Sequence, residues 1–383
     1  MTLLIYGAYG FTGELVAREA LDRGLDPLLA GRDGDALREL GRELRCSVRE
    51  FSLDFPETVT ESVRDVDAVL NCAGPFASTA TQLADACLET RTDYLDVTGE
   101  IEVFEALAEW DTPAADAGIT LLPGVGFDVV PTDCVAARLA EALPEATHLE
   151  LAFATGGGGG VSRGTARTAI RGLGEGSAVR EDGEIRRVSL GSRSRRVTFG
   201  SGDGEGAGGR SGGAGEPREY GTVAVPWGDV STAFHTTGIP NVTVYAAIPP
   251  RARRLIRIAR PLSPVLRTRP IRWALDRLVR SRIEGPSPAE RADAEVLVWG
   301  EARNAATGET VTARLRTGDA YEFTAASAVT AAERVLAGGA PSGFTTPAGA
   351  FGWRFVETVD GTEWLTVPSD GDTPANAGVS GRN

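Results

Sequence analysis

The stretch LLIYGAYGFTGELV, residues 3–16, decides how this chain begins to fold. Its first four residues form a short apolar run, which is typical of a buried parallel strand. A segment with helical period covers 11–24, and three glycines stand between the two at a spacing of three: Gly7, Gly10 and Gly13. Strand, glycine turn and helix in this order form the context in which such glycines indicate dinucleotide binding.

Each glycine has a physical role in this turn. Gly7 allows the tight turn itself, Gly10 lets the backbone approach a pyrophosphate, and Gly13 lets the helix pack closely on the strand. The first amides of the helix, at Phe11 and Thr12, then face the phosphates. We therefore expect these five positions to bind a cofactor.

The first 122 residues alternate between two hydrophobic periods, which is typical of βαβ units and a parallel sheet. We therefore predict an α/β fold that begins with a Rossmann-type parallel-sheet domain over residues 1–125. The expected strands are 2–6, 27–31, 47–54, 67–74, 93–100 and 119–124, and the expected helices are 11–24, 33–44, 80–91 and 102–118.

The second strand ends in LLAGRD, where an NAD-binding domain usually offers an acid to the ribose hydroxyls. Here the chain offers Arg32, whose guanidinium fits a 2′-phosphate, so NADP(H) is favoured over NAD. The neighbouring Asp33 is expected to cap the next helix. Asp54, after the third strand, is a candidate for the adenine edge or a plain turn residue. The fourth strand runs into a loop that we expect to line the cofactor: Asn71, Cys72, Ala73, Gly74 and Pro75.

Composition excludes several chemistries. The 383 residues contain no lysine, which rules out a Walker A phosphate loop and a lysine Schiff base. Only two histidines are present, and no cysteine stands in a CxxC pair, so we expect no metal site. A net charge of −14 disfavours nucleic acid as a partner. The reduced cysteines and the missing leader indicate a cytoplasmic protein, and the acidic, lysine-free surface resembles that of halophilic archaeal proteins.

The pattern changes after Gly126. We expect a substrate and dimerisation domain over 126–324, a C-terminal segment over 338–367 and a disordered tail over 368–383. The glycine-rich 199–217 is expected to be a mobile insertion, and 227–248 to form paired strands. The segment 251–283 carries eleven arginines beside apolar helical stripes; it is either an internally docked helical hairpin or a peripheral membrane contact.

Several motifs together resemble the saccharopine dehydrogenase-like oxidoreductase family, which includes trans-acting enoyl reductases. These motifs are GAYGFTG, AGR, NCAGPF, YLDVTGE and GFDVVPTD, and the likeness runs over most of residues 1–355. The resemblance implies a second α/β domain with a mixed sheet, a helix near 325–337 that returns to the first domain, and NADP(H) as the cofactor. It also implies that Asp128, in the Gly-x-Asp turn at 126–128, faces the substrate. We further expect a homodimer through the second domain.

A hydride transfer needs a placed acceptor and one proton donor. Asp128 and Glu100 are the catalytic candidates, with turn stabilisation and helix capping as their structural alternatives. Tyr94, Asp96 and Thr98 lie near the same edge, and His235 is expected to be a structural residue on a strand.

The leading prediction is an NADP(H)-dependent reductase of a carbonyl or activated C=C bond in a small apolar, lipid or isoprenoid substrate. Two alternatives stay open. One is a saccharopine-type amino-acid dehydrogenase, and the other is a non-catalytic protein that senses NADP or docks on a membrane.

Overall fold

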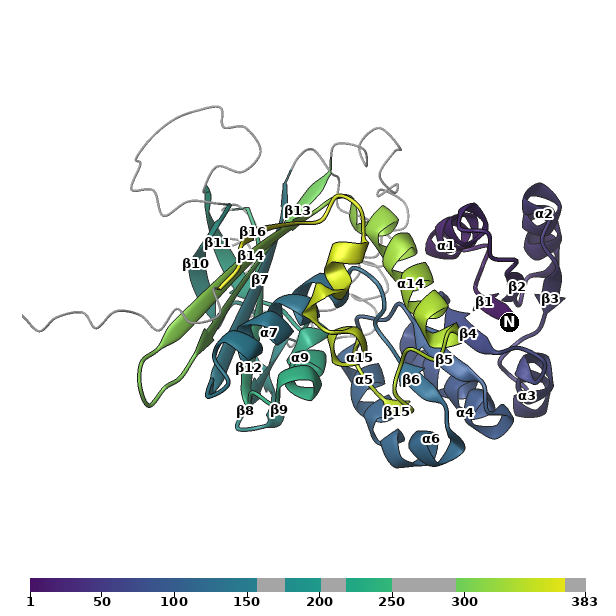
Figure 1. The fold of residues 1–383 in the computed structure, drawn as a ribbon, viewed down its shortest axis with the longest axis horizontal. Coiled ribbons are helices and arrows are strands. Elements are labelled where there is room, and N and C mark those ends of the chain that lie inside the picture. Colours follow the sequence, from purple (N-terminus) through teal and green to yellow (C-terminus); the bar gives the residue numbers. More distant parts are fainter. Residues whose placement is uncertain (157–175, 201–217, 250–293, 369–383) are drawn as a thin grey trace, which may run out of the picture.

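A computed structural model describes residues 1–156, 176–200, 218–249 and 294–368 of the chain. The predictions for 201–217, for 251–283 and for the tail beyond Pro368 lie outside these residues. Figure 1 shows two sheets at opposite ends of the molecule, with helices of both halves of the chain between them. In the described part of the chain, no helix is long and apolar enough to cross a membrane.

The first sheet is parallel throughout and has the order β15-β6-β5-β4-β1-β2-β3. Without β15 this is the Rossmann order, which gathers the carboxyl ends of the strands at one edge. The expected six strands are present and a seventh joins them from the C-terminal segment. The bounds are β1 (Leu3–Tyr6), β2 (Leu28–Gly31), β3 (Val48–Glu50), β4 (Ala68–Asn71), β5 (Asp93–Asp96), β6 (Thr120–Leu122) and β15 (Gly343–Phe344).

Six helices connect these strands, and one prediction about them is wrong. The expected single helix over 102–118 is two helices that break at Trp110, because Pro113 has no amide hydrogen and its ring would clash with a preceding carbonyl. Sequence patterns also gave no sign of α3. The bounds are α1 (Phe11–Asp22), α2 (Gly34–Leu44), α3 (Pro56–Val63), α4 (Ala80–Thr90), α5 (Ile101–Ala108) and α6 (Asp111–Ala117).

The second sheet is mixed, with the order β10-β11-β12-β7-β13-β14-β16 and the hairpin β8–β9 attached to β12. Strands β12 and β7 run parallel, and the other pairs are antiparallel. The bounds are β7 (His148–Gly156), β8 (Ser177–Glu181), β9 (Glu184–Val188), β10 (Ser194–Phe199), β11 (Arg218–Ala224), β12 (Asn241–Ala247), β13 (Glu295–Arg303), β14 (Thr310–Thr317) and β16 (Glu363–Thr366).

The prediction of paired strands over 227–248 is wrong in its first half. Asp229–Thr237 form helix α9, which ends at Gly238 with a φ of +72°. Its threonines and valine favour a strand locally, but glycine in the left-handed region is a common helix stop. Packing of α9 against α7 (Val130–Ala142) and α5 stabilises the helix in place of the strand.

Helix α14 (Ala320–Leu336) returns to the first domain and packs on α1 and β4. It begins five residues earlier than the predicted 325, because the Asp319 side chain caps it by accepting the amides of Tyr321 and Glu322. The ion pair between Arg23 of α1 and Glu333 of α14 joins the two helices further along.

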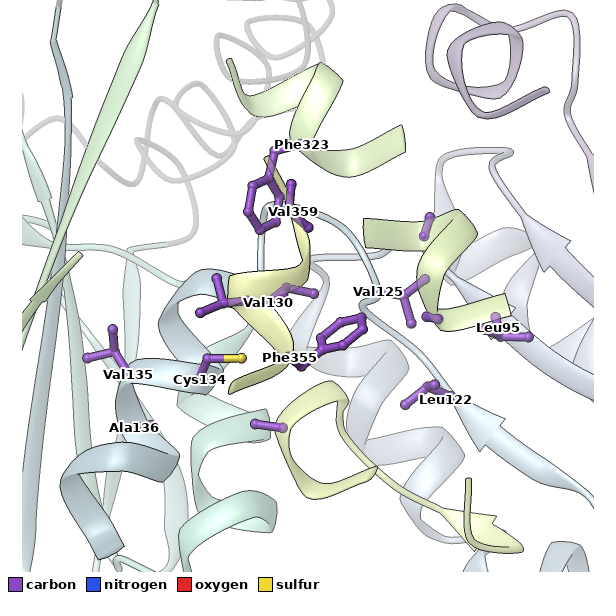
Figure 2. Close-up of a cluster of buried hydrophobic side chains, with 14 of the residues drawn as sticks. Leu95, Leu122, Val125, Val130, Cys134, Val135, Ala136, Phe323, Phe355 and Val359 are labelled. Atoms are coloured by element: carbon purple, nitrogen blue, oxygen red, sulfur yellow. The ribbon is translucent and has the colours of Figure 1, made fainter. Parts of the chain in front are cut away.

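One apolar core runs between the two sheets. Figure 2 shows Phe355 pointing towards Val125, near Val130 of α7. Phe355 belongs to a 3-10 turn, η3 (Trp353–Thr358), that follows the short helix α15 (Pro347–Phe351), and its side chain is fully buried. The same cluster contains Leu95 of the first sheet and Leu151 of the second. The C-terminal segment therefore joins the two halves of the chain through buried apolar surface.

Candidate functional site

The glycine turn after β1 is packed so tightly that side chains do not fit. Gly7 has a φ of +80°, and a Cβ atom there would lie 2.8 Å from the Cβ of Ala73. A Cβ at Gly13 would lie 2.2 Å from the carbonyl oxygen of Gly7. The turn therefore contacts the loop after β4 on one side and the start of α1 on the other.

The start of α1 has the features of a phosphate site. Within the described residues, the backbone amides of Thr12 and Gly13 have no acceptor, as the first turn of a helix requires. A Cβ atom at Gly10 would meet only the Gly7 oxygen, at 3.2 Å, so the side facing away from the protein is open. Free amides beside open space fit the pyrophosphate of a dinucleotide. Phe11 is half exposed and packs edge-on against Tyr321 at 4.9 Å.

The ends of β2 and β3 place a cation and an acid together. Arg32 is exposed and makes no ion pair with the described residues. Burial raises the pKa of Tyr6 to about 12, and the charges of Arg32 and Asp54 both act on its hydroxyl, so the two groups lie near it. Asp33 accepts the Ala36 amide at 3.1 Å and caps α2, as expected. Arg32 is thus the free charge at this end, while Asp54 accepts a hydrogen bond from Ser52.

Asn71 shapes the loop after β4 through hydrogen bonds, but its side chain does not line the candidate site. Asn71 is fully buried; its Oδ1 accepts the Ala73 amide at 3.0 Å, and its Nδ2 donates to Tyr94 at 3.2 Å. The site can therefore use this residue only through the loop backbone. Burial raises the pKa of the partly exposed Cys72 thiol to about 12, with a further contribution from Asp96, so the thiol is neutral and unreactive.

Glu100 connects the loops after β4 and β5. Its Oε1 accepts the Phe76 amide and its Oε2 the Ala77 amide, both at 3.0 Å. These amides belong to the 3-10 turn η1 (Phe76–Ser78), and the Glu100 amide itself donates to Thr98. Because both carboxylate oxygens are engaged, Glu100 positions the loop and does not cap α5, the structural alternative weighed for it.

Asp96 and Tyr94 hold the strand ends together from within. The Asp96 carboxylate is fully buried and accepts the Tyr94 hydroxyl at 2.8 Å and the amides of Thr98 and Gly124. Burial raises the pKa of Asp96 to about 6, although these hydrogen bonds lower it. The Asp96 side chain therefore ties the loop after β5 to the loop after β6.

Asp128 has a different environment from the other acids at this edge. Its side chain is exposed, yet desolvation by the surrounding protein raises its pKa to about 6. Within the described residues, no hydrogen bond or ion pair engages its carboxyl group. A Cβ at Gly99 would lie 2.9 Å from Asp128 Oδ2, so the carboxyl group lies directly against the loop after β5.

The start of α14 also reaches the site, although it lies about two hundred residues later in the sequence. Thr324 Oγ1 accepts the Phe127 amide at 3.0 Å, and Tyr321 covers Phe11 of the glycine turn. Sequence reasoning placed no functional residue here, because the helix was expected to begin only near residue 325. The pattern Asp319-x-x-Glu322 is a capping signal that could have located the helix start.

The second domain meets α5 through a charged cluster. Glu105 contacts Arg180 of β8 at 2.5 Å, Ser231 of α9 at 2.5 Å and His235 of α9 at 3.5 Å. Burial raises the pKa of Glu105, but His235, Ser231 and Arg180 outweigh this effect and lower it to about 2. His235 is a helix residue paired with an acid, not a strand residue as predicted.

Two acids are buried where α7 meets α9. Asp133 accepts Thr236 Oγ1 at 2.5 Å and the Ala348 amide at 2.8 Å, and Asp229 accepts Thr132 Oγ1 at 2.7 Å. Burial raises the pKa of Asp133 to about 6. Burial and then the charge of Asp133 raise the pKa of Asp229 well above its ordinary value. All of these donors are neutral, so ionising the pair is unfavourable in the folded state.

We expect Asp133→Asn to stabilise the protein at alkaline pH. A carboxyl group whose pKa is higher in the folded state stabilises the fold fully below its unfolded pKa, and this contribution is lost as pH rises through the folded pKa. For Asp133 the window runs from about pH 4 to about pH 6, and the relief is about 3 kcal/mol at pH 8. Urea unfolding at pH 4.5 and pH 8 measures it. A variant that is less stable than wild type at pH 8 would contradict this account.

Comparison with known proteins agrees with this geometry. Residues 3–122 match the family described as the saccharopine dehydrogenase NADP binding domain. The first domain of this chain is therefore similar to the NADP-binding domain of saccharopine dehydrogenases. The yeast saccharopine dehydrogenase (L-Glu forming), solved without ligand, superposes over 94% of this chain and 96% of its own with a TM-score of 0.58. At 12% identity this likeness shows the two-domain fold alone.

Two curated relatives align with part of the chain. The human saccharopine dehydrogenase-like oxidoreductase is 30% identical over 151 residues, which cover 34% of this chain and 35% of the relative. The trans-acting enoyl reductase of Mycobacterium tuberculosis is 30% identical over 139 residues, covering 34% of this chain and 33% of the relative. The chain thus aligns with about a third of the length of each relative.

Proposed function

We propose that this chain is an NADP(H)-dependent oxidoreductase that reduces a carbonyl or an activated C=C bond of an apolar substrate. The observation that carries the proposal is the unpaired carboxyl group of Asp128 beside the loops that border the dinucleotide site. The family match supports an NADP-binding domain. The name of the mycobacterial relative, an enoyl reductase, supports a C=C bond as one acceptor class.

The chain's own residues have distinct tasks in this proposal. The amides of Thr12 and Gly13 bind the pyrophosphate, and Arg32 pairs with the 2′-phosphate. Glu100 holds the loop at Phe76 and Ala77, which would face the nicotinamide half of the cofactor. When bound, NADPH supplies the hydride.

Asp128 supplies the proton. A hydride added to a carbonyl or enone leaves negative charge on the acceptor, and the protonated carboxyl group neutralises it. A pKa of about 6 suits this task, because the acid is partly protonated near neutral pH and releases its proton readily. Desolvation that favours the protonated form is therefore functional here.

The cofactor part of the proposal predicts a selective loss in Arg32→Ala. We expect wild type to bind NADPH at least tenfold more tightly than NADH. The variant should lose roughly 10- to 100-fold in NADPH affinity, because a bidentate ion pair is worth about 1.5–3 kcal/mol, and should bind NADH unchanged. Titration by quenching of protein fluorescence measures both constants.

Arg64→Ala is the matched control. Arg64 is an exposed arginine that follows α3, and among the described residues it pairs with Glu61. It precedes β4 and so lies at the amino ends of the strands, away from the candidate site. The variant should bind both nucleotides as wild type does. Equal wild-type affinity for NADPH and NADH, or an unchanged NADPH affinity in Arg32→Ala, would refute the NADP preference.

A further inference from the structure

Two aromatic side chains of the second domain stand beside the Asp128 turn. Trp227 lies just before α9 and packs on Phe153 of β7, with ring centroids 4.4 Å apart and planes tilted by 38°. Both side chains are partly exposed, although both also pack against the buried core. The pair therefore presents flat apolar surface to solvent.

The backbone places this pair at the candidate site. A Cβ atom at Gly228 would lie 3.1 Å from Val129 and 3.5 Å from the carbonyl oxygen of Gly99. Gly99 also contacts the Asp128 carboxyl group. The turn at 227–228 and the turn at 126–129 thus both lie against Gly99 of the first domain, which brings Trp227, the neighbour of Gly228, close to the Asp128 turn.

The Asp128 turn carries an aromatic residue of its own. Phe127 is partly exposed and packs edge-on against the buried Phe323 of α14, with centroids 5.8 Å apart. On the second-domain side, the side chains of Arg180 and His235 are both engaged by Glu105. Asp229, next to Gly228, is a buried acid. A substrate carboxylate would therefore face apolar aromatic surface here, which does not compensate the loss of its hydration.

We propose that Trp227, supported by Phe153, is the specificity-determining residue of the site and receives a flat apolar acceptor, such as an aryl ketone or a conjugated enone. This inference rests on the proposed reductase function. Ring stacking aligns a planar acceptor parallel to the Trp227 ring and keeps its reducible bond beside Asp128. Dicarboxylate acceptors are disfavoured by the same surroundings.

Ligand binding tests the role of Trp227 and Phe153 independently of turnover. Calorimetric titration of the NADP⁺-bound full chain with 2-methoxynaphthalene, a flat and non-reducible probe, is compared with titration by 2-oxoglutarate. We expect the aromatic probe to bind more tightly, Trp227→Leu to weaken it at least tenfold, and Trp227→Phe to stay within threefold. Trp110→Leu is the control, because Trp110 lies at the far end of α5. An unchanged affinity in Trp227→Leu, or a preference for 2-oxoglutarate, would overturn the inference.

Turnover separates this inference from the function on which it rests. NADPH oxidation is followed at 340 nm with benzylideneacetone as acceptor. We expect Trp227→Leu to lower kcat/KM at least tenfold, mainly through KM, with NADPH affinity unchanged. If the probe binds through Trp227 but wild type oxidises no NADPH, the reductase function is refuted and the role of Trp227 in ligand binding is kept. If wild type and Trp227→Leu turn over the acceptor equally, the role of Trp227 is refuted and the reductase function is kept.

Discussion

Asp128→Asn is expected to reduce the rate of acceptor reduction roughly 10²- to 10⁴-fold, the usual contribution of a positioned proton donor. Asparagine has nearly the same shape, so the turn at 126–128 and the contact with Gly99 are kept. NADPH affinity should stay within threefold, because the phosphate and ribose contacts lie elsewhere. Single-turnover measurement of NADPH oxidation separates the chemical step from binding.

The pH profile identifies the proton donor. With a pKa of about 6 for Asp128, kcat/KM for reduction should be level below pH 6 and fall about tenfold per pH unit above it. The reverse reaction needs the ionised form and should rise over the same range. Asp128→Asn should lose this dependence, and Glu102→Gln, which removes an exposed acid on α5, should keep it. A variant that keeps both rate and profile would exclude Asp128 as the donor.

The second large effect concerns two glycines of one turn. Gly13→Ala would place its Cβ 2.2 Å from the Gly7 carbonyl oxygen, so backbone must move where α1 packs on β1. We expect the free energy of unfolding to fall by about 3 kcal/mol or more. Gly10→Ala meets only one atom, at 3.2 Å, and should fold normally.

For cofactor binding, we expect Gly10→Ala to have a large effect although its effect on stability is small. The methyl group of Gly10→Ala occupies the open side that a pyrophosphate approaches, so we expect NADPH affinity to fall at least tenfold in a stable protein. Urea unfolding and NADPH titration of both variants measure the two effects. Full NADPH affinity in Gly10→Ala would mean that the phosphates do not lie on this turn.

The first domain was predictable because its signals are local. Most strands are short apolar runs and most helices have a 3.6-residue period, with glycines or capping residues such as Asp33 between them. The polar strand β3 and the unpredicted helix α3 are exceptions. The second domain was less predictable because its pairing is not local. Strand β7 pairs with β12, about ninety residues later, and α9 is a helix through packing and not through the propensity of its residues.

The residues of the candidate site also divide into those with local sequence signals and those that depend on non-local packing. Arg32 was located by its place after the second strand, and Asp128 through the resemblance of its Gly-x-Asp turn. The structure leaves both side chains exposed. Glu100 and Asn71 were also located, but their partners, the amides of the loop after β4, depend on three-dimensional packing. Trp227 reaches the site from a distant part of the chain, and sequence spacing carries no information about that proximity.

A crystal structure of the chain with NADP⁺ tests the central claim most directly. We predict the pyrophosphate within hydrogen-bonding distance of the Thr12 and Gly13 amides, the 2′-phosphate on Arg32, and the nicotinamide ring beside the loop at 72–76 with Asp128 facing it. A nucleotide bound in the reverse direction, or a nicotinamide ring out of reach of any acceptor held at Asp128, would contradict this account.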